Sequence, residues 1–186
     1  MKILFVALIL VTQVAMAQST RPNTPYWQLV DEVERTGLVA YERFNWSEQS
    51  LQKILKNVPT ISNLLSEIGR RKIVYKIGGE NEGNTGFTTL LKNGDLYVQV
   101  YYAKHLKNID VVQTLGHELT HAYHIDSDLF YIWQSNVRNN KKAYAQCVSE
   151  MGAYTWSAIY AESKSKKDWY IGMVEENQKC MKDLSK

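Results

Sequence analysis

Apolar residues recur at helical spacing between residues 24 and 69, and this spacing predicts three helices. Each expected helix begins at a Ser or Thr whose hydroxyl can cap its first turn, and each ends at Gly or Asn. The expected ranges are Thr24 to Gly37, Ser47 to Asn57 and Thr60 to Gly69. This part of the chain is therefore expected to be helical.

The period changes to two after residue 70. Lys72 to Ile77 alternates polar and apolar residues, which is typical of a strand, and a glycine-rich loop to Gly86 follows. Asn93-Gly94 predicts a two-residue type I′ turn between strands Phe87 to Lys92 and Asp95 to Tyr102. That turn sets the pairs on the apolar face of the hairpin as Leu91 with Leu96, Thr89 with Val98, and Phe87 with Val100.

Helical periodicity returns from Asn108 and predicts a helix to about Ile125. An aromatic-rich connector, Asp126 to Asn140, leads to a long helix from Lys141 to about Glu162. A last amphipathic helix is expected from about Lys166 to Leu184. The pattern as a whole predicts an α+β fold. It is mostly helical, with a small antiparallel sheet, built on the hairpin, packed against the helix that starts near residue 108.

The first residues have the features of a cleaved signal peptide. Lys2 precedes an apolar run from Ile3 to Val11 that is too short for a membrane span. Ala15-Met16-Ala17 has the small-x-small form that signal peptidase recognises, so we expect residues 1–17 to be removed near Ala17. The protein is then secreted or periplasmic. Residues 18–186 form a single domain, because about 169 residues suffice for one hydrophobic core.

Composition limits the classes of partner. The formal net charge is +3 and both signs are interspersed, so the sequence gives no indication of nucleic-acid binding. No later stretch approaches the ~20 apolar residues that a membrane helix needs. Cys147 and Cys180 are expected to form one intrachain disulfide between the two C-terminal helices, because an oxidising compartment favours the bridge.

The candidate chemistry is concentrated in the helix that starts near residue 108. His117-Glu118-Leu119-Thr120-His121 is an HExxH motif. The two histidines project within about 40° of each other and one turn apart, so both imidazoles can bind one Zn²⁺. Glu118 points to the side, where its carboxylate suits a general base acting on a metal-bound water. The apolar stripe of this helix lies roughly opposite the histidines, so they do not belong to the core face.

A catalytic zinc ion takes three protein ligands, and the motif supplies two. Glu150 is the leading third ligand, because it lies 29 residues after His121 on the next long helix. Gly152 and Ala153 beside it would let the two helices approach closely. A surface position for Glu150 stays an alternative, and the competing ligand candidates are Asp126, Asp128 and Glu162.

Two further residues on these helices are candidates for supporting roles. His124 shares a face with His117 and His121 but lies about 10 Å along the axis from His117, too far for one ion. We expect His124 to support the site or to be a polar residue at the helix end. Tyr154, one turn beyond Glu150, could donate its phenol to the oxyanion of a tetrahedral intermediate, or it could pack in the core.

The HExxH motif, followed some thirty residues later by Glu150-Met-Gly-Ala-Tyr154, resembles the gluzincin type of zinc metallopeptidase. It is similar to small, minimal gluzincins and to toxin-type metallopeptidase domains, over roughly residues 95–160. The resemblance implies a zincin-like fold, and a strand at Asp95 to Tyr102 whose edge binds an extended peptide. The metzincin pattern is excluded, because His124 and Ser127 stand where it requires Gly and His.

The expected function is hydrolysis of peptide bonds in a peptide or protein substrate. One Zn²⁺ per chain would be held by His117, His121 and Glu150, with Glu118 as the general base. The alternative is a secreted zinc-binding or structural protein without catalysis. A structural site is closed by four protein ligands, and Cys147, one turn from Glu150, would be the candidate for the fourth.

Overall fold

The computed structural model describes residues 21–45, 47–78, 85–101 and 107–185. The expected signal peptide, residues 1–17 with its cleavage near Ala17, lies outside them. The elements in chain order are α2 (Pro25–Arg35), α3 (Glu48–Asn57), α4 (Pro59–Ser66), β1 (Ile73–Ile77), β2 (Gly86–Leu90), β3 (Leu96–Val100), α5 (Asn108–Asp126), α6 (Leu129–Ser135), α7 (Lys141–Ile159) and α8 (Lys164–Leu184). The mostly helical α+β fold is confirmed. In the described part of the chain, no helix is both long and apolar enough to cross a membrane.

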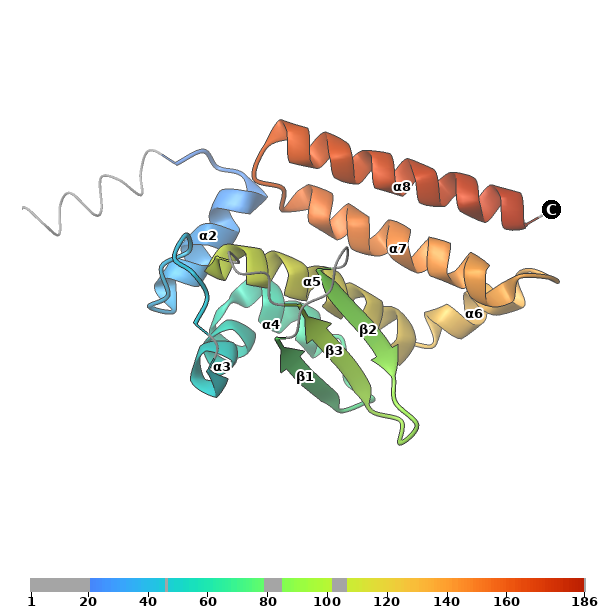
Figure 1. Ribbon diagram of the computed structural model, residues 1–186, viewed down its shortest axis with the longest axis horizontal. Helices are drawn as coiled ribbons and strands as arrows, with labels where there is room; N and C mark the ends of the chain where they lie inside the picture. Colours follow the sequence, from blue (N-terminus) through green and yellow to red (C-terminus); the bar gives the residue numbers. More distant parts are fainter. Residues whose placement is uncertain (1–20, 46, 79–84, 102–106, 186) are drawn as a thin grey trace, which may run out of the picture.

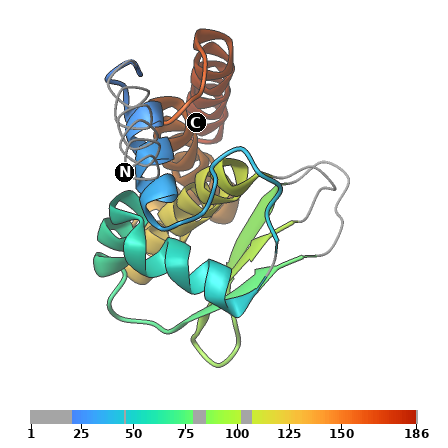
Figure 2. The same cartoon turned by 90° about the vertical axis from the view of Figure 1, so that its left-hand side faces the viewer.

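Helix α5 lies at the centre of the fold. The three-stranded sheet packs on one side of it and α7 on the other, and α8 lies over α7 as an outer layer (Figure 1). Helices α2, α3 and α4 cover a third flank (Figure 2). The apolar core is built from these three helices, the sheet and α5, whereas α8 has no buried residue. The α5–α7 contact is therefore held on one side by the main core and on the other by α8.

The caps of the first helices were predicted in two cases out of three. The hydroxyl of Thr24 accepts from Trp27 N at 3.4 Å, and that of Ser47 accepts from Ser50 N at 3.0 Å. Thr60 does not cap α4, because the helix begins one residue earlier, at Pro59. The Glu32 carboxylate of α2 instead accepts from Thr60 N at 2.8 Å. A tertiary contact between two helices thus replaces the expected local cap.

The sheet is mixed: the hairpin pair is antiparallel, as predicted, but a third strand pairs in parallel, so the sheet as a whole is not antiparallel. The strand order is β1–β3–β2, with β1 parallel and β2 antiparallel to β3. The hairpin places β2 on one edge of β3, so β1 occupies the other edge. The strand expected to bind a peptide by its edge, Asp95 to Tyr102, is therefore the central strand along Leu96–Val100, and that expectation is wrong.

The hairpin register differs from the predicted one by one residue. Gly94 has φ of +89° while Asn93 does not have positive φ, which excludes the type I′ turn. Gly94 N donates to Leu91 O at 3.0 Å, and Leu91 N donates to Asp95 O at 2.8 Å, so the loop has three residues rather than two. The observed pairs are Leu90 with Leu96, Thr88 with Val98, Phe87 with Gln99 and Gly86 with Val100.

The shift of one residue exchanges the two faces of β2. Phe87 was predicted to face inward, but it is 46% exposed. Gly86 and Thr88 share the other face, which lies against α5 at Glu118. The sheet therefore contacts the HExxH helix, as predicted, but through different residues of β2.

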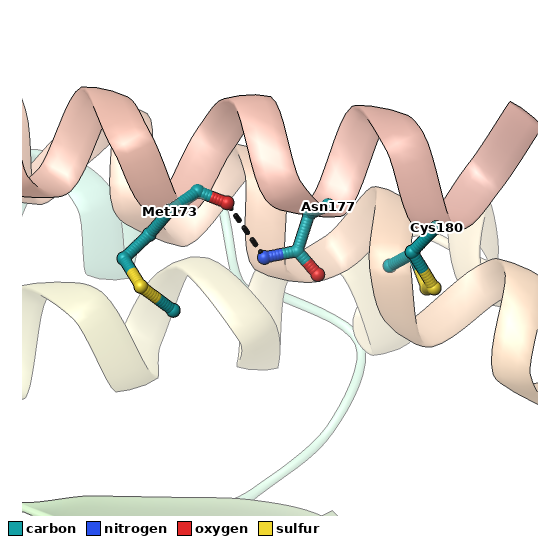
Figure 3. Close-up of a disulfide and its surroundings, with 4 residues drawn as sticks. Met173, Asn177 and Cys180 are labelled. Atoms are coloured by element: carbon teal, nitrogen blue, oxygen red, sulfur yellow. Dashed lines mark hydrogen bonds between the residues drawn. A yellow bond between two sulfur atoms is a disulfide. The ribbon is translucent and has the colours of Figure 1, made fainter.

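The C-terminal helices follow the prediction with shifted ends. The expected connector contains the short helix α6, which the sequence pattern did not indicate. Helix α7 ends at Ile159, and α8 begins at Lys164, where the Ser163 hydroxyl accepts from Lys166 N at 3.2 Å. The predicted disulfide between Cys147 of α7 and Cys180 of α8 is confirmed. It lies one turn beyond the Asn177 amide, which bonds to the Met173 carbonyl of α8 at 2.9 Å (Figure 3).

Candidate metal centre

The structure brings together the three predicted metal ligands. His117 and His121 project from α5, and Glu150 faces them from α7. Glu150 Oε2 lies 3.8 Å from His117 Nε2 and 3.5 Å from His121 Nε2. Within the described ranges, this is the one group of three His, Cys, Asp or Glu side chains whose ligand atoms lie close enough to hold a metal ion.

Two separations in this group are close to those between the ligands of a tetrahedral zinc ion, and all three ligand atoms lie within 4.8 Å of one another. Nitrogen and oxygen ligands about 2.0–2.1 Å from Zn²⁺ lie roughly 3.4 Å from one another in a tetrahedron. The two separations from Glu150, 3.5 and 3.8 Å, are close to that value. Two imidazoles and one carboxylate form a donor set that zinc accepts readily, and three ligands leave a fourth position for water or substrate.

Each of the two histidines that face Glu150 is held at its other nitrogen by a serine of α7. His117 Nδ1 lies 3.0 Å from Ser157 Oγ, and His121 Nδ1 lies 2.8 Å from Ser149 Oγ. Both rings therefore direct Nε2 toward Glu150. The serines were missed at the level of sequence. Their signal is a stripe of small residues at i, i+4 and i+8, consisting of Ser149, Ala153 and Ser157, which lies beside Glu150 and is buried.

His124 lies next to the site and does not join the group that could hold a metal. Its Nδ1 lies 2.9 Å from Ser149 Oγ, the same hydroxyl that contacts His121. The ring is nearly buried and packs edge-on against Trp133 of α6, with ring centroids 4.9 Å apart. Burial lowers the pKa of His124 to about 4, so the ring is neutral near pH 7.

Burial also keeps His117 in the form that binds metals. Desolvation, together with the neighbouring His121, lowers the pKa of His117 to about 4, although the Glu150 carboxylate acts to raise it. The pKa of Glu150 is lowered: burial acts to raise it, but the contacts with His121 and His117 outweigh this. Near pH 7 the site therefore presents a neutral imidazole at His117 beside an ionised carboxylate at Glu150, the forms that ligate zinc.

Glu118 lies beside the group, between α5 and the sheet. It is 5% exposed, and its Oε2 accepts from the Thr88 hydroxyl at 2.7 Å. A Cβ added at Gly86 would lie 2.6 Å from Glu118 Cδ, so the glycine leaves room for the carboxylate. Burial raises the pKa of Glu118, while the neighbouring His121 and the Thr88 hydrogen bond lower it. A carboxylate with a raised pKa suits a group that takes up and releases a proton.

Tyr154 lies beside one of the histidines that face Glu150. Its ring packs edge-on against His117, with centroids 5.0 Å apart. On its other side it contacts Trp169 and Tyr170 of α8, with centroids 6.1 and 6.3 Å away. Burial and the nearby Glu150 raise the pKa of the phenol, which keeps it protonated and able to donate a hydrogen bond.

The competing ligand candidates are occupied elsewhere. Asp126 accepts from Gly69 N at 3.1 Å and Arg70 N at 3.0 Å, and Asp128 pairs with the Arg70 guanidinium. Glu162 pairs with Lys166 at 3.2 Å on the surface. Cys147 is in the disulfide, so it does not provide a thiolate ligand.

Two glycines let α5 and α7 approach closely enough to form the site. A Cβ at Gly152 would lie 2.6 Å from His124 Cε1, as the prediction of close approach at Gly152 requires. A Cβ at Gly116 would lie 2.7 Å from Trp156 Cε2 of α7. The helices therefore meet through glycine on each side, with the paired His and Ser residues between.

The candidate metal site is assigned from the positions of these side chains alone, because no similarity to a known protein supports it. Glu150 reaches the two HExxH histidines from a second helix, and the resemblance to gluzincins rests on those same residues. Comparisons of the chain with protein-family models, with curated proteins and with solved structures found no match, so that resemblance stays a prediction.

Proposed function

We propose that this protein is a zinc-dependent peptidase that uses water to hydrolyse peptide bonds. One observation carries the proposal: Nε2 of His117 and Nε2 of His121 converge on Glu150 Oε2, at 3.8 and 3.5 Å. Glu118 follows His117 in the motif. Its carboxylate lies beside this group and accepts a hydrogen bond from the Thr88 hydroxyl. Three ligands and an adjacent base are the parts that metal-assisted hydrolysis requires.

The zinc ion, when bound, would supply an acidified water and a polarised scissile carbonyl. Glu118 accepts the proton of the attacking water and delivers it to the nitrogen of the leaving amine, so the carboxylate is regenerated in each cycle. The Tyr154 phenol, protonated and beside His117, is suited to donate to the oxyanion that develops at the carbonyl oxygen when water adds to the carbonyl carbon. His117, His121 and Glu150 would hold the ion.

An extended peptide would lie along β2, the edge strand next to Glu118. Among the described strands, β2 pairs with β3 alone. Its residues Gly86 and Thr88 face the Glu118 carboxylate. Main-chain pairing to such an edge binds a peptide without demanding a particular sequence. This assignment replaces the central strand as the peptide-binding element.

The proposed compartment is outside the cytoplasm. The Cys147–Cys180 disulfide is of the kind that persists in an oxidising environment. Together with the N-terminal features of a signal peptide, it supports a secreted or periplasmic protein.

The alternative function, a zinc-binding structural protein without catalysis, requires a fourth protein ligand. Cys147 was the candidate for that position, and its disulfide argues against it. Within the described residues, the group that could hold a metal has three members. Three ligands favour catalysis over a closed structural site.

The proposal is tested by measuring zinc content and peptide cleavage on the same purified proteins. We expect one zinc per chain in wild type, zinc without turnover in Glu118→Gln, and loss of zinc in Glu150→Ala. Glu162→Ala, which removes an exposed glutamate just beyond α7, is the matched control and should resemble wild type. Cleavage by Glu118→Gln at the wild-type rate would exclude the mechanism. Zinc bound by wild type with no cleavage of a diverse peptide mixture would favour the structural alternative.

A further inference from the structure

We infer that Ser149 and His124 are positioning residues: a hydrogen-bond chain from His121 through the Ser149 hydroxyl to His124 fixes His121 in the tautomer that can bind a metal. The inference rests on the proposed metal site and assigns roles to two side chains that the proposed reaction does not use.

The chain is continuous and shielded from water. Ser149 Oγ lies 2.8 Å from His121 Nδ1 and 2.9 Å from His124 Nδ1. Ser149 is 4% exposed and His124 is 8% exposed. Hydrogen bonds in such surroundings do not compete with bulk water, so their direction is set by the protein.

Counting protons fixes the direction of the chain. A neutral imidazole has one N–H and one lone pair, and a hydroxyl has one proton to donate. For His121 Nε2 to offer its lone pair to a metal, its proton must sit on Nδ1 and be donated to Ser149 Oγ. The Ser149 proton is then free for His124 Nδ1, which accepts it, and His124 carries its own proton on Nε2. The reverse order would protonate His121 Nε2 and block the ligand atom.

The same counting explains why His121 needs a partner that His117 does not. The Ser157 hydroxyl donates to the Ala153 carbonyl of its own helix at 3.1 Å. Its oxygen can therefore only accept from His117 Nδ1, which fixes that ring without further help. For Ser149, the partners found among the described residues are the two histidine rings. His124 Nδ1 thus accepts the Ser149 proton, in the way that the Ala153 carbonyl accepts the Ser157 proton.

The residues around His124 hold its ring in the orientation that directs Nδ1 at Ser149. A Cβ at position 152 would lie 2.6 Å from His124 Cε1, so Gly152 gives the ring its place. The Trp133 ring covers it edge-on, with centroids 4.9 Å apart. A ring held from both sides keeps Nδ1 directed at Ser149.

Four variants separate this role from a general effect on packing. Ser149→Ala removes the link, and His124→Phe keeps an aromatic ring beside Trp133 but removes the acceptor. His124→Asn restores an acceptor, its side-chain oxygen, near the position of Nδ1. Thr155→Ala is the control, because Thr155 is on α7 with its hydroxyl bonded to Met151 O at 2.7 Å on the exposed side.

The measurements are the zinc dissociation constant and the protonated nitrogen of each histidine, read from ring nitrogen NMR of the metal-free protein. We expect His117 and His121 protonated at Nδ1 and His124 at Nε2 in wild type. Ser149→Ala and His124→Phe should lose the His121 preference and weaken zinc binding about 10- to 100-fold. His124→Asn should recover much of the affinity, and Thr155→Ala should match wild type.

Two results would overturn the inference. One is an unchanged zinc affinity, with His121 still protonated at Nδ1, in His124→Phe. The other is His124 protonated at Nδ1 in metal-free wild type. Failure of wild type to bind zinc would remove the proposed function, but the tautomers of the metal-free protein would still decide the inference by the same criteria.

Discussion

Gly86 of the edge strand β2 lies directly against Glu118 of α5, so that a Cβ at position 86 would be 2.6 Å from Glu118 Cδ. The glycine is needed here for space rather than for its backbone angle, since its φ is not positive. The same strand supplies Thr88, whose hydroxyl donates to Glu118 Oε2 at 2.7 Å. One short strand therefore provides both the room and the hydrogen bond that set the position of the proposed base.

Gly86→Ala is expected to reduce kcat/KM about 10- to 100-fold while zinc content stays at the wild-type level. The added methyl group displaces the Glu118 carboxylate, and small displacements of a catalytic group have effects of this size. Peptide cleavage and elemental analysis on one preparation check this. Gly172→Ala on α8 is the control, because its Cβ would meet nothing within 4 Å. Wild-type activity in Gly86→Ala would mean that Glu118 is not the base, or that β2 moves to make room for the methyl group and leaves the carboxylate in place.

Thr88→Val is expected to move the acidic limb of the kcat/KM profile to higher pH. The Thr88 hydrogen bond lowers the pKa of Glu118, against the larger effect of burial, which raises it. Valine keeps the shape of threonine and removes the donor, so the pKa rises further. A general base works when deprotonated, so activity is then lost at a higher pH as the solution is acidified. A profile that stays in place, or moves to lower pH, would contradict this role for Thr88.

The sequence predicted the parts of the site whose geometry is local. His117 and His121 share a face because they are four residues apart on one helix, and that holds in any fold. Glu150 could be selected because its helix, its spacing and the small residues after it indicated a second helix close by. Asp126 was the weaker candidate because it lies at the end of the histidine helix itself. Its actual partners, the backbone N–H groups of Gly69 and Arg70, come from a distant segment and could not be predicted from sequence.

The parts that were missed depend on how distant segments meet. Asn93-Gly94 is compatible with two turn types, and the choice between them decides whether Phe87 or Thr88 faces α5. Ser149 acquires its role only when α7 docks on α5 with its hydroxyl between two histidine rings. No local sequence pattern determines the turn type or the role of Ser149. Both depend on tertiary packing, which the sequence alone did not show.

Gly116→Ala is expected to destabilise the protein by about 1–3 kcal/mol, because the methyl group would overlap the Trp156 ring where α5 meets α7. Zinc affinity should fall with it, since the same contact aligns His117 with Ser157. Chemical denaturation followed by tryptophan fluorescence, together with zinc titration, checks both effects. Adding Trp156→Leu should recover part of the loss, because the smaller side chain leaves space for the methyl group. Two losses that simply add would show that the residues do not compete for space.

Replacing both cysteines, Cys147→Ser with Cys180→Ser, is expected to lower stability strongly and to leave the metal site intact. The bridge spans 33 residues of sequence, and closing a loop of that size contributes roughly 3–4 kcal/mol in the chain-entropy model. For a domain of this length the loss lowers Tm by about 10 °C, which thermal unfolding followed by circular dichroism measures.

The zinc content of the same double variant distinguishes the two roles considered for Cys147. If the three ligands are His117, His121 and Glu150, the folded variant below its Tm binds one zinc per chain, as wild type does. A sulfur ligand would predict the opposite, because serine is a poor substitute for a thiolate at zinc. Glu150→Ala, measured beside it, gives the zinc content expected when a true ligand is lost. Retention of zinc together with the fall in Tm would therefore assign the cysteines to holding α8 on α7, and the carboxylate of α7 to the metal.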